Sequence, residues 1–185
     1  YATDLLLRDL GGPKTLQSWL TQVGITGLRV DRNIAGLLRA RRDLKDVRDS
    51  STPRAMVELL KKLDSGGLLQ PWSRSYLLGL MGRCMTGKNR IRGLLPAGTQ
   101  VQNKTGTLNG YASDVGFITL PNGRRIAIAL FARYGPNRPS TIPRAARTIY
   151  NGFLYASPQQ LTSNSWTYQP NRKAAPVPLV QAPAQ

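Results

Sequence analysis

The sequence has no histidine and only one cysteine among its 185 residues. Without histidine, neither a Ser-His-Asp triad nor a Cys-His pair can form. Cys84 has no second thiol to pair with and no metal-ligand residues beside it, and its place between Met81 and Met85 predicts a buried thiol. No apolar run approaches the roughly 18 residues of a membrane-spanning helix, so we expect no such span.

Acidic residues are scarce as well. Nine aspartates and glutamates stand against 26 lysines and arginines, a formal net charge of +17. Residues 1–64 carry 12 basic and 8 acidic side chains, whereas residues 65–185 carry 14 and 1. A field of this sign attracts polyanions, so a polyanion- or nucleic-acid-binding protein is one hypothesis and an ordinary basic protein is another. The basic residues are scattered, without zinc-finger spacing or an aromatic-rich RNA-binding strand, which disfavours nucleic-acid readout.

The first part of the chain has the hydrophobic periodicity of helices. Apolar residues recur every three to four positions, after threonine or proline starts and before glycine stops. Helices are predicted from Thr3 to Gly11-Gly12, from Pro13 to Gly24, from Thr52-Pro53 to Gly66-Gly67, and onward from Pro71. Residues 31–50 lack this periodicity and predict an Ω-like loop.

After Pro96 the hydrophobic period changes to two residues, which predicts antiparallel strands. The strands cover residues 99–107, 112–120 and 125–133, with a tight hairpin at Pro121-Asn122-Gly123. A closing helix over residues 143–154 would place Ala146, Ile149 and Phe153 on the sheet.

These elements predict an α+β chain with a mixed organisation. A helical lobe covers residues 1–97 and includes the Ω-like loop. Residues 98–157 form the three-stranded part of a sheet and the C-terminal helix. Residues 158–185, with five prolines, form an extended tail that has no independent fold and is pinned by Trp166 and Tyr168.

Lys104-Thr105-Gly106-Thr107 stands at the end of the first predicted strand. A lysine beside two hydroxyls on a strand edge can hold a carboxylate and leave a backbone N–H free for an oxyanion. A Lys-(Thr/Ser)-Gly triplet alone is weak, since composition produces it by chance in roughly one such chain in ten. An ordinary strand edge with a solvated lysine would explain the four residues equally well.

The flanking blocks strengthen this motif. In order, they are Asp4 to Leu7 with Gly11-Gly12-Pro13, Val30-Asp31-Arg32, Arg48 to Pro53, Ala55-Met56, Thr86-Gly87, and Arg90 to Thr107. Together they resemble the class A β-lactamases and their penicillin-binding relatives, over roughly residues 1 to 155. The resemblance implies a β-lactamase/transpeptidase-like fold, with a helical lobe beside an antiparallel sheet.

The resemblance also implies roles for individual residues. Lys104 would stabilise the substrate carboxylate, and Thr105 and Thr107 would donate hydrogen bonds to it. The N–H of Thr107 would form half of the oxyanion hole, which makes Thr107 the candidate catalytic residue of this chain. Arg90 would supply a second cation behind the strand, and Gly106 would let the substrate approach the backbone.

Three further residues have structural roles by the same resemblance. Arg32 and Asp49 would form the ion pair that closes the neck of the Ω-like loop. Seventeen positions separate them, a little more than is usual in the family, so the loop is expected to be reshaped. Asp114 follows the strand turn and is expected to be structural. Neither a metal nor a cofactor is implied.

Two family motifs are absent from these 185 residues. No serine has a lysine three positions later, and Ser-Asp-Asn does not occur; Ser113-Asp114-Val115 comes after the Lys-Thr-Gly block. Tyr1 would lie immediately beyond the place of Ser-Asp-Asn. The resemblance thus implies that the nucleophile and its lysine come from a missing N-terminal segment, and that the fold is incomplete without it. Ile126, Ile128 and Leu130 would then sit on an uncovered edge.

A third departure concerns deacylation. Class A enzymes have a glutamate two residues after the Asp-Arg pair, where this chain has Ile34 after Asp31-Arg32-Asn33. Isoleucine can neither accept a proton nor orient a water molecule, so hydrolysis of an acyl-enzyme is doubtful. Asp43 or Asp46 could substitute only from a rearranged loop.

Three functions are therefore open. One is a serine hydrolase that acts on β-lactams or on the D-Ala-D-Ala ends of peptidoglycan, periplasmic or secreted as its relatives are. Another is a non-catalytic cell-wall-binding module of the same fold, whose charge suits anionic wall polymers. The third is the polyanion binder, which charge alone supports.

Overall fold

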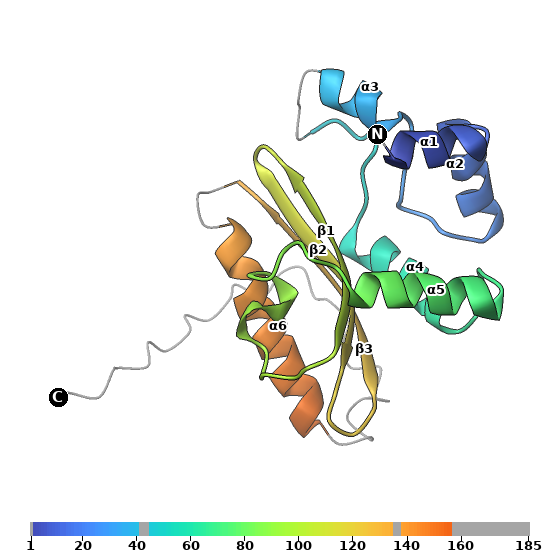
Figure 1. Ribbon diagram of the computed structural model, residues 1–185. Helices are drawn as coiled ribbons and strands as arrows, with labels where there is room; N and C mark the ends of the chain where they lie inside the picture. The colour runs from blue at the N-terminus through green and yellow to red at the C-terminus, as the bar shows by residue number, and fades with distance from the viewer. Residues whose placement is uncertain (1, 41–44, 135–137, 157–185) are drawn as a thin grey trace, which may run out of the picture. The chain divides into compact units, whose positions relative to one another are not determined.

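The computed structural model describes residues 2–40, 45–134 and 138–156. The chain divides into the units Tyr1–Leu154 and Tyr155–Gln185, and the fold is that of the first unit (Figure 1). Its elements are α1 (Ala2–Asp9), α2 (Pro13–Gln22), α3 (Ile34–Arg39), α4 (Pro53–Asp64), α5 (Pro71–Gly82), the 3-10 turn η1 (Ile91–Leu94), β1 (Val101–Leu108), β2 (Tyr111–Thr119), β3 (Arg125–Arg133) and α6 (Arg138–Tyr155). The predicted tail, including Trp166 and Tyr168, lies outside the described residues.

The three strands form an antiparallel sheet in the order β1-β2-β3. The hairpin between β2 and β3 is closed by the Leu120 N–H, which donates to the Arg124 carbonyl oxygen at 2.8 Å. All three strands lie within two residues of their predicted bounds, because strict alternation of apolar residues is a local property.

Alternate residues of the sheet face two different helical layers. On one face, Ile118 and Ile128 pack with α6 in a cluster that also holds Ile91 of η1. On the other face, Val115 and Phe117 pack against Leu60 and Leu63 of α4 and partly buried residues of α5. Figure 1 shows α6 on one side of the strands and α4 and α5 on the other.

As expected, β3 is an edge of the sheet without a strand partner on its outer side among the described residues, although the side chains of Ile126 and Ile128 are buried in the cluster under α6. One expectation for α6 was wrong. Phe153 is 38% exposed, and Tyr150 faces the sheet with Ile142 and Ala146 instead. The contacting residues therefore follow a spacing of four.

The Ω-like loop contains a helix that periodicity did not reveal. Asn33 caps α3, since its Oδ1 accepts the Gly36 N–H at 2.8 Å. The carboxylate of Asp4 on α1 accepts the N–H groups of Ile34 and Ala35 at 2.7 and 2.9 Å. A helix of six residues is too short to be stable alone, so these side chains hold it in place. None of the described helices is both long and apolar enough to cross a membrane.

Gly116→Ala is expected to destabilise the sheet. An added Cβ would lie 2.7 Å from the Asn103 Cα and closer still to the Gln102 carbonyl oxygen, so β1 and β2 would have to separate. Urea denaturation should show a loss of about 1–3 kcal/mol in the free energy of unfolding. Gly152→Ala is the control, because an added Cβ there meets nothing within 4 Å and alanine is favoured in a helix by roughly 0.5–1 kcal/mol. Equal stability of the two variants would contradict the β1–β2 contact.

Candidate active site

The Lys-Thr-Gly-Thr segment forms the exposed end of β1, an edge strand of the described sheet. Lys104 is exposed, and its Nζ donates to the Thr105 carbonyl oxygen at 2.5 Å. No carboxylate among the described residues pairs with Lys104. An edge strand also presents every second backbone N–H away from its neighbour. This edge therefore offers an unpaired cation, hydroxyls and backbone donors to a ligand.

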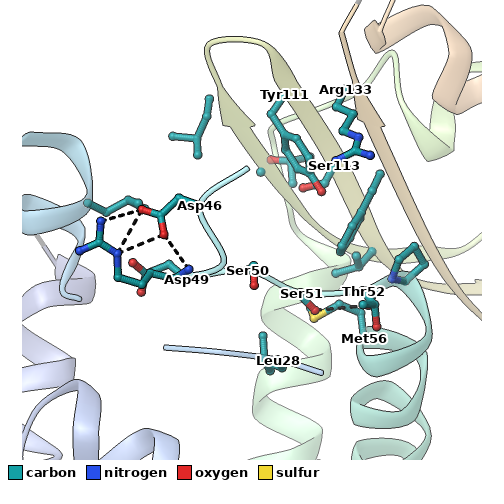
Figure 2. Close-up of a pocket in the computed structure, with 18 of the residues that line it drawn as sticks. Leu28, Asp46, Asp49, Ser50, Ser51, Thr52, Met56, Tyr111, Ser113 and Arg133 are labelled. Carbon is teal, nitrogen blue, oxygen red and sulfur yellow. Dashed lines mark hydrogen bonds and ion pairs between the residues drawn. The ribbon is translucent and has the colours of Figure 1, made fainter. Parts of the chain in front are cut away.

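A cavity of about 680 Å³ lies between the sheet and the loop that leads into α4. Figure 2 shows Tyr111, Ser113 and Arg133 on the sheet side, and Asp46 and Asp49 on the loop side. Alternate residues of the strands line it, because alternate side chains share one face of a sheet; they include Lys104, Gly106, Leu108, Val115 and Phe131. Thr105 also lines it, whereas Thr107 lies outside it and is exposed.

Arg90 lies behind β1 and binds the backbone of two strands. It is 8% exposed, and its Nη1 donates to the carbonyl oxygens of Gly106 at 2.8 Å and Ser113 at 2.7 Å. Its Nη2 donates to the Thr107 Oγ1 at 2.6 Å. Because Thr107 Oγ1 accepts this bond, its own proton is free to be donated to a ligand. Arg90 thus fixes the edge strand and orients one of its hydroxyls.

A buried carboxylate, Asp114, lies beside Arg90. Asp114 and Asn103 are both fully buried. The Arg92 Nε donates to Asn103 Oδ1 at 3.1 Å, the Asn103 Nδ2 donates to Asp114 Oδ1 at 2.9 Å, and the Ile91 N–H donates to Asp114 Oδ2 at 3.1 Å. Every donor and acceptor in this chain of contacts has a defined direction, which locks η1 to β1 and β2.

The burial of Asp114 raises its pKa above the ordinary value, while the hydrogen bonds from Asn103 and Ile91 and the charges of Arg90 and Arg92 lower it. Desolvation is the largest effect and outweighs the others. The structural role expected for Asp114 is thus compatible with its surroundings, which hold it by polar contacts on both oxygens.

Two glycines make room for side chains of the motif. A Cβ on Gly106 would lie 2.5 Å from Ser113 Oγ on the neighbouring strand. Gly106 is therefore needed for strand packing, in addition to the substrate approach expected from the sequence. A Cβ on Gly87 would overlap Thr105 Cγ2, and the Thr105 Oγ1 lies 2.7 Å from the Thr86 Oγ1. Cys84, expected to be a buried thiol, is half-buried beside Thr86.

The structure brings Arg32 and Asp49 together at the neck of the loop. The Arg32 Nε lies 2.5 Å from Asp49 Oδ2. Asp49 Oδ1 accepts the N–H groups of Asp31 and Arg32 at 2.7 and 2.9 Å, and Asp31 Oδ2 accepts the Asp49 N–H at 2.9 Å. Asp49 has a φ of 51°, a conformation that aspartate tolerates better than most residues. These bonds join the entry of the loop, at Asp31 and Arg32, to its exit at Asp49 and so close the neck.

Asp46 is a poor candidate for a general base. Both of its oxygens accept from the Arg48 guanidinium, at 2.8 to 3.1 Å, and one also accepts the Arg48 N–H at 2.9 Å. These hydrogen bonds lower the pKa of Asp46 to about 2. A carboxylate this acidic takes up a proton weakly at neutral pH. Asp43 lies outside the described residues.

Ile34 begins α3 and does not line the cavity. Asp4, whose carboxylate holds the Ile34 and Ala35 N–H groups, has a pKa below its usual range because of those bonds, the Ala35 bond first. Both oxygens of Asp4 are therefore already engaged. Within residues 2–40, 45–134 and 138–156, no group of three or more histidine, cysteine, aspartate or glutamate side chains could hold a metal ion.

Residues 1–153 match the family model described as the β-lactamase enzyme family. The chain belongs to this family. The predicted α+β fold of a helical lobe beside an antiparallel sheet is confirmed by solved class A β-lactamases.

Individual relatives show how much of such a protein the chain represents. The carbapenem-hydrolysing β-lactamase KPC of Klebsiella oxytoca is 35% identical over 158 residues, covering 82% of this chain and 53% of that protein. The extended-spectrum β-lactamase PER-1 of Pseudomonas aeruginosa is 33% identical over 159 residues, covering 80% and 51%. The crystal structure of the TLA-1 extended-spectrum β-lactamase superposes with a TM-score of 0.75 at 29% identity, covering 82% of this chain and 58% of that one. The chain spans about half the length of the curated β-lactamases it matches.

Sequence reasoning missed several residues that build the site. Asn103 and Arg92 were not assigned any role, although Asp114 is the only acid in residues 65–185, and a solitary acid among arginines is a signal for a buried pair. Asp4 and Arg133 were missed because their neighbours come from distant parts of the chain.

Exchanging the two side chains at 103 and 114 should restore what each single change loses. In Asp114→Asn the new amide group would face the Asn103 amide donor, or Asn103 would turn round and lose its bond from Arg92. Either outcome is expected to lower the free energy of unfolding by about 1–3 kcal/mol. In the double variant Asn103→Asp with Asp114→Asn, Arg92 donates to the new carboxylate at position 103. The new amide at position 114 donates to the same carboxylate and still accepts the Ile91 N–H. Urea denaturation of the single and double variants should therefore show recovery of most of the loss. Additive losses in the double variant would contradict the directed contacts.

Proposed function

We propose that this chain is the substrate-carboxylate-binding part of a β-lactamase-like serine hydrolase. The substrates are β-lactams or the D-Ala-D-Ala ends of peptidoglycan, which both present a carboxylate close to a reactive carbonyl. Lys104 neutralises the carboxylate, Thr105 and Thr107 donate hydrogen bonds to it, and the Thr107 N–H stabilises the developing oxyanion. By analogy with the relatives, the protein acts in the periplasm or outside the cell.

The single observation that carries this proposal is the state of the β1 edge. Lys104 is an exposed cation with no acidic partner among the described residues, and Arg90 holds the Thr107 hydroxyl as an acceptor at 2.6 Å. Beyond its bond to the Thr105 carbonyl oxygen, the Lys104 ammonium has further N–H donors to offer a ligand, and the Thr107 hydroxyl is preorganised to donate. Preorganised donors are the main means by which enzymes of acyl transfer stabilise negative charge.

The nucleophile is proposed to lie in a further segment of the protein that carries Ser-x-x-Lys and Ser-Asp-Asn. Support comes from the helical lobe, where α5 has no buried residue. Trp72 and Tyr76 stack on each other at 5.6 Å and are 75% and 56% exposed. Apolar surface of this extent calls for a covering element.

Deacylation is proposed to be slow. By the resemblance to class A enzymes, Ile34 takes the place of their glutamate, and Asp46, with its low pKa, is a weak base. Acylation does not involve position 34, because it depends on the serine, its lysine and the oxyanion hole. A penicilloyl-enzyme should form and persist, since a missing general base costs about 10²–10⁴-fold in rate. A protein of this kind would bind the drug or the wall rather than turn over quickly.

A non-catalytic wall-binding module is the second candidate, and Ile34 is the observation that favours it. It keeps the carboxylate site and the net charge of +17, which suits anionic wall polymers. The presence of covalent labelling distinguishes the two functions.

Pre-steady-state kinetics of the full-length protein with nitrocefin tests the proposal. We expect a burst close to one equivalent of product, followed by release slower than acylation by about 10²–10⁴-fold. Mass spectrometry after penicillin treatment should show a stable adduct. Ile34→Glu is expected to speed release and leave the burst unchanged.

Leu38→Glu serves as the matched control, because Leu38 is also an exposed apolar residue of α3. Rapid multiple turnover by the unmodified protein would contradict slow deacylation. Absence of any adduct would favour the wall-binding module.

A further inference from the structure

The cavity carries an excess of two positive charges. Four basic side chains line it, Arg32, Arg48, Lys104 and Arg133, together with two acidic ones, Asp46 and Asp49. Arg32 pairs with Asp49 and Arg48 pairs with Asp46. Lys104 and Arg133 remain without an acidic partner in the part of the chain that the structure describes. The cavity is therefore electrostatically suited to a ligand with two negative charges.

The two unpaired cations lie at opposite ends of the sheet wall. Lys104 pairs with Val115, and Arg133 pairs with Tyr111 on the other side of β2. Four residues along β2 span about 13 Å, and two strand spacings span about 10 Å, so the two backbone positions are roughly 16 Å apart. The Lys104 Nζ lies at the Thr105 carbonyl oxygen of its own strand, and the Arg133 guanidinium lies over the Tyr134 ring, so one compact anion does not bridge the two cations in this arrangement. A second anionic group is needed, some residues away along an extended ligand.

Aromatic side chains hold Arg133 and line the path between the two cations. The Arg133 guanidinium lies 5.4 Å from the centre of the Tyr134 ring, and Tyr134 adopts a φ of 59°, which is rare for a bulky residue. Burial raises the pKa of Tyr111, and the charge of Arg133 partly offsets this, so Arg133 acts on the phenol electrostatically. Tyr111 and Phe131 meet edge to face at 6.0 Å and form an apolar floor.

We propose that Arg133 is a specificity-determining residue that binds a second acidic group of the substrate, at the end of the cavity opposite Lys104. The preferred ligand is an extended acidic peptide, with its C-terminal carboxylate on Lys104 and an acidic group two to four residues earlier on Arg133. Tyr111 and Ser113, which line the same wall, supply hydroxyls beside the guanidinium. This inference rests on the proposed function, because it takes the Lys104 end as the carboxylate site.

Two peptides that differ in one charge test the inference. Acetyl-Glu-Gly-D-Ala-D-Ala and acetyl-Gln-Gly-D-Ala-D-Ala are titrated into the full-length protein, and Kd is measured by calorimetry at low and high salt. The unmodified protein should bind the glutamate peptide roughly three- to tenfold more tightly at low salt, and salt should reduce the difference. Arg133→Ala should abolish the preference for the glutamate peptide, whereas Arg133→Lys should retain part of it.

Arg144→Ala is the matched control, since Arg144 is an exposed arginine on α6, across the sheet from the cavity. It should keep the full preference, and circular dichroism checks that each variant is folded. Equal Kd values for the two peptides in the unmodified protein, or a preference that survives Arg133→Ala, would overturn the inference while penicillin labelling still supports the proposed function. Loss of both labelling and peptide binding in the unmodified protein would overturn the proposed function, and this inference with it.

Discussion

The buried guanidinium of Arg90 is the contact on which the geometry of the site depends. It joins the carbonyl oxygens of Gly106 and Ser113 on neighbouring strands and the hydroxyl of Thr107. Hydrogen bonds from a charged donor are each worth about 1.5–3 kcal/mol when buried. The same contact both fixes the edge strand and leaves the Thr107 proton available, so stability of the sheet and orientation of the site have one cause.

A buried cation needs compensation, and the chain provides it with very few acids. Asp114 is the one acid in residues 65–185, and it is fully buried beside Arg90 and Arg92. In the loop, Asp49 and Asp46 take the charges of Arg32 and Arg48. These acids therefore pair with structural arginines, and among the basic residues that line the cavity Lys104 and Arg133 keep an uncompensated charge within the described residues. This division explains how a chain of +17 keeps a defined cationic site.

Hydrophobic periodicity in the sequence was sufficient to predict the helices and strands that are determined by their own residues. The helices α1, α2, α4 and α5 and the three strands were predicted close to their observed bounds, whereas α6 begins five residues before its predicted start at residue 143. The helix α3 was not predicted, because Asp4, thirty residues away, holds its first N–H groups. Family likeness placed Arg90 behind the strand, but its backbone acceptors leave no trace in a sequence. Phe153 was assigned to the sheet together with Ala146 and Ile149, whereas the rotation of α6, set by tertiary packing, brings Tyr150 there.

The central claim is that the Lys104 end of β1 binds the carboxylate of the substrate in the acylation transition state. The most direct test is the second-order rate constant for acylation of the full-length protein by benzylpenicillin, measured for Lys104→Ala. A charged, hydrogen-bonded contact to the carboxylate predicts a fall of about 10²-fold or more, while Lys14→Ala, an exposed lysine on α2, should leave the rate unchanged. A rate for a folded Lys104→Ala variant within threefold of the unmodified protein would contradict the claim.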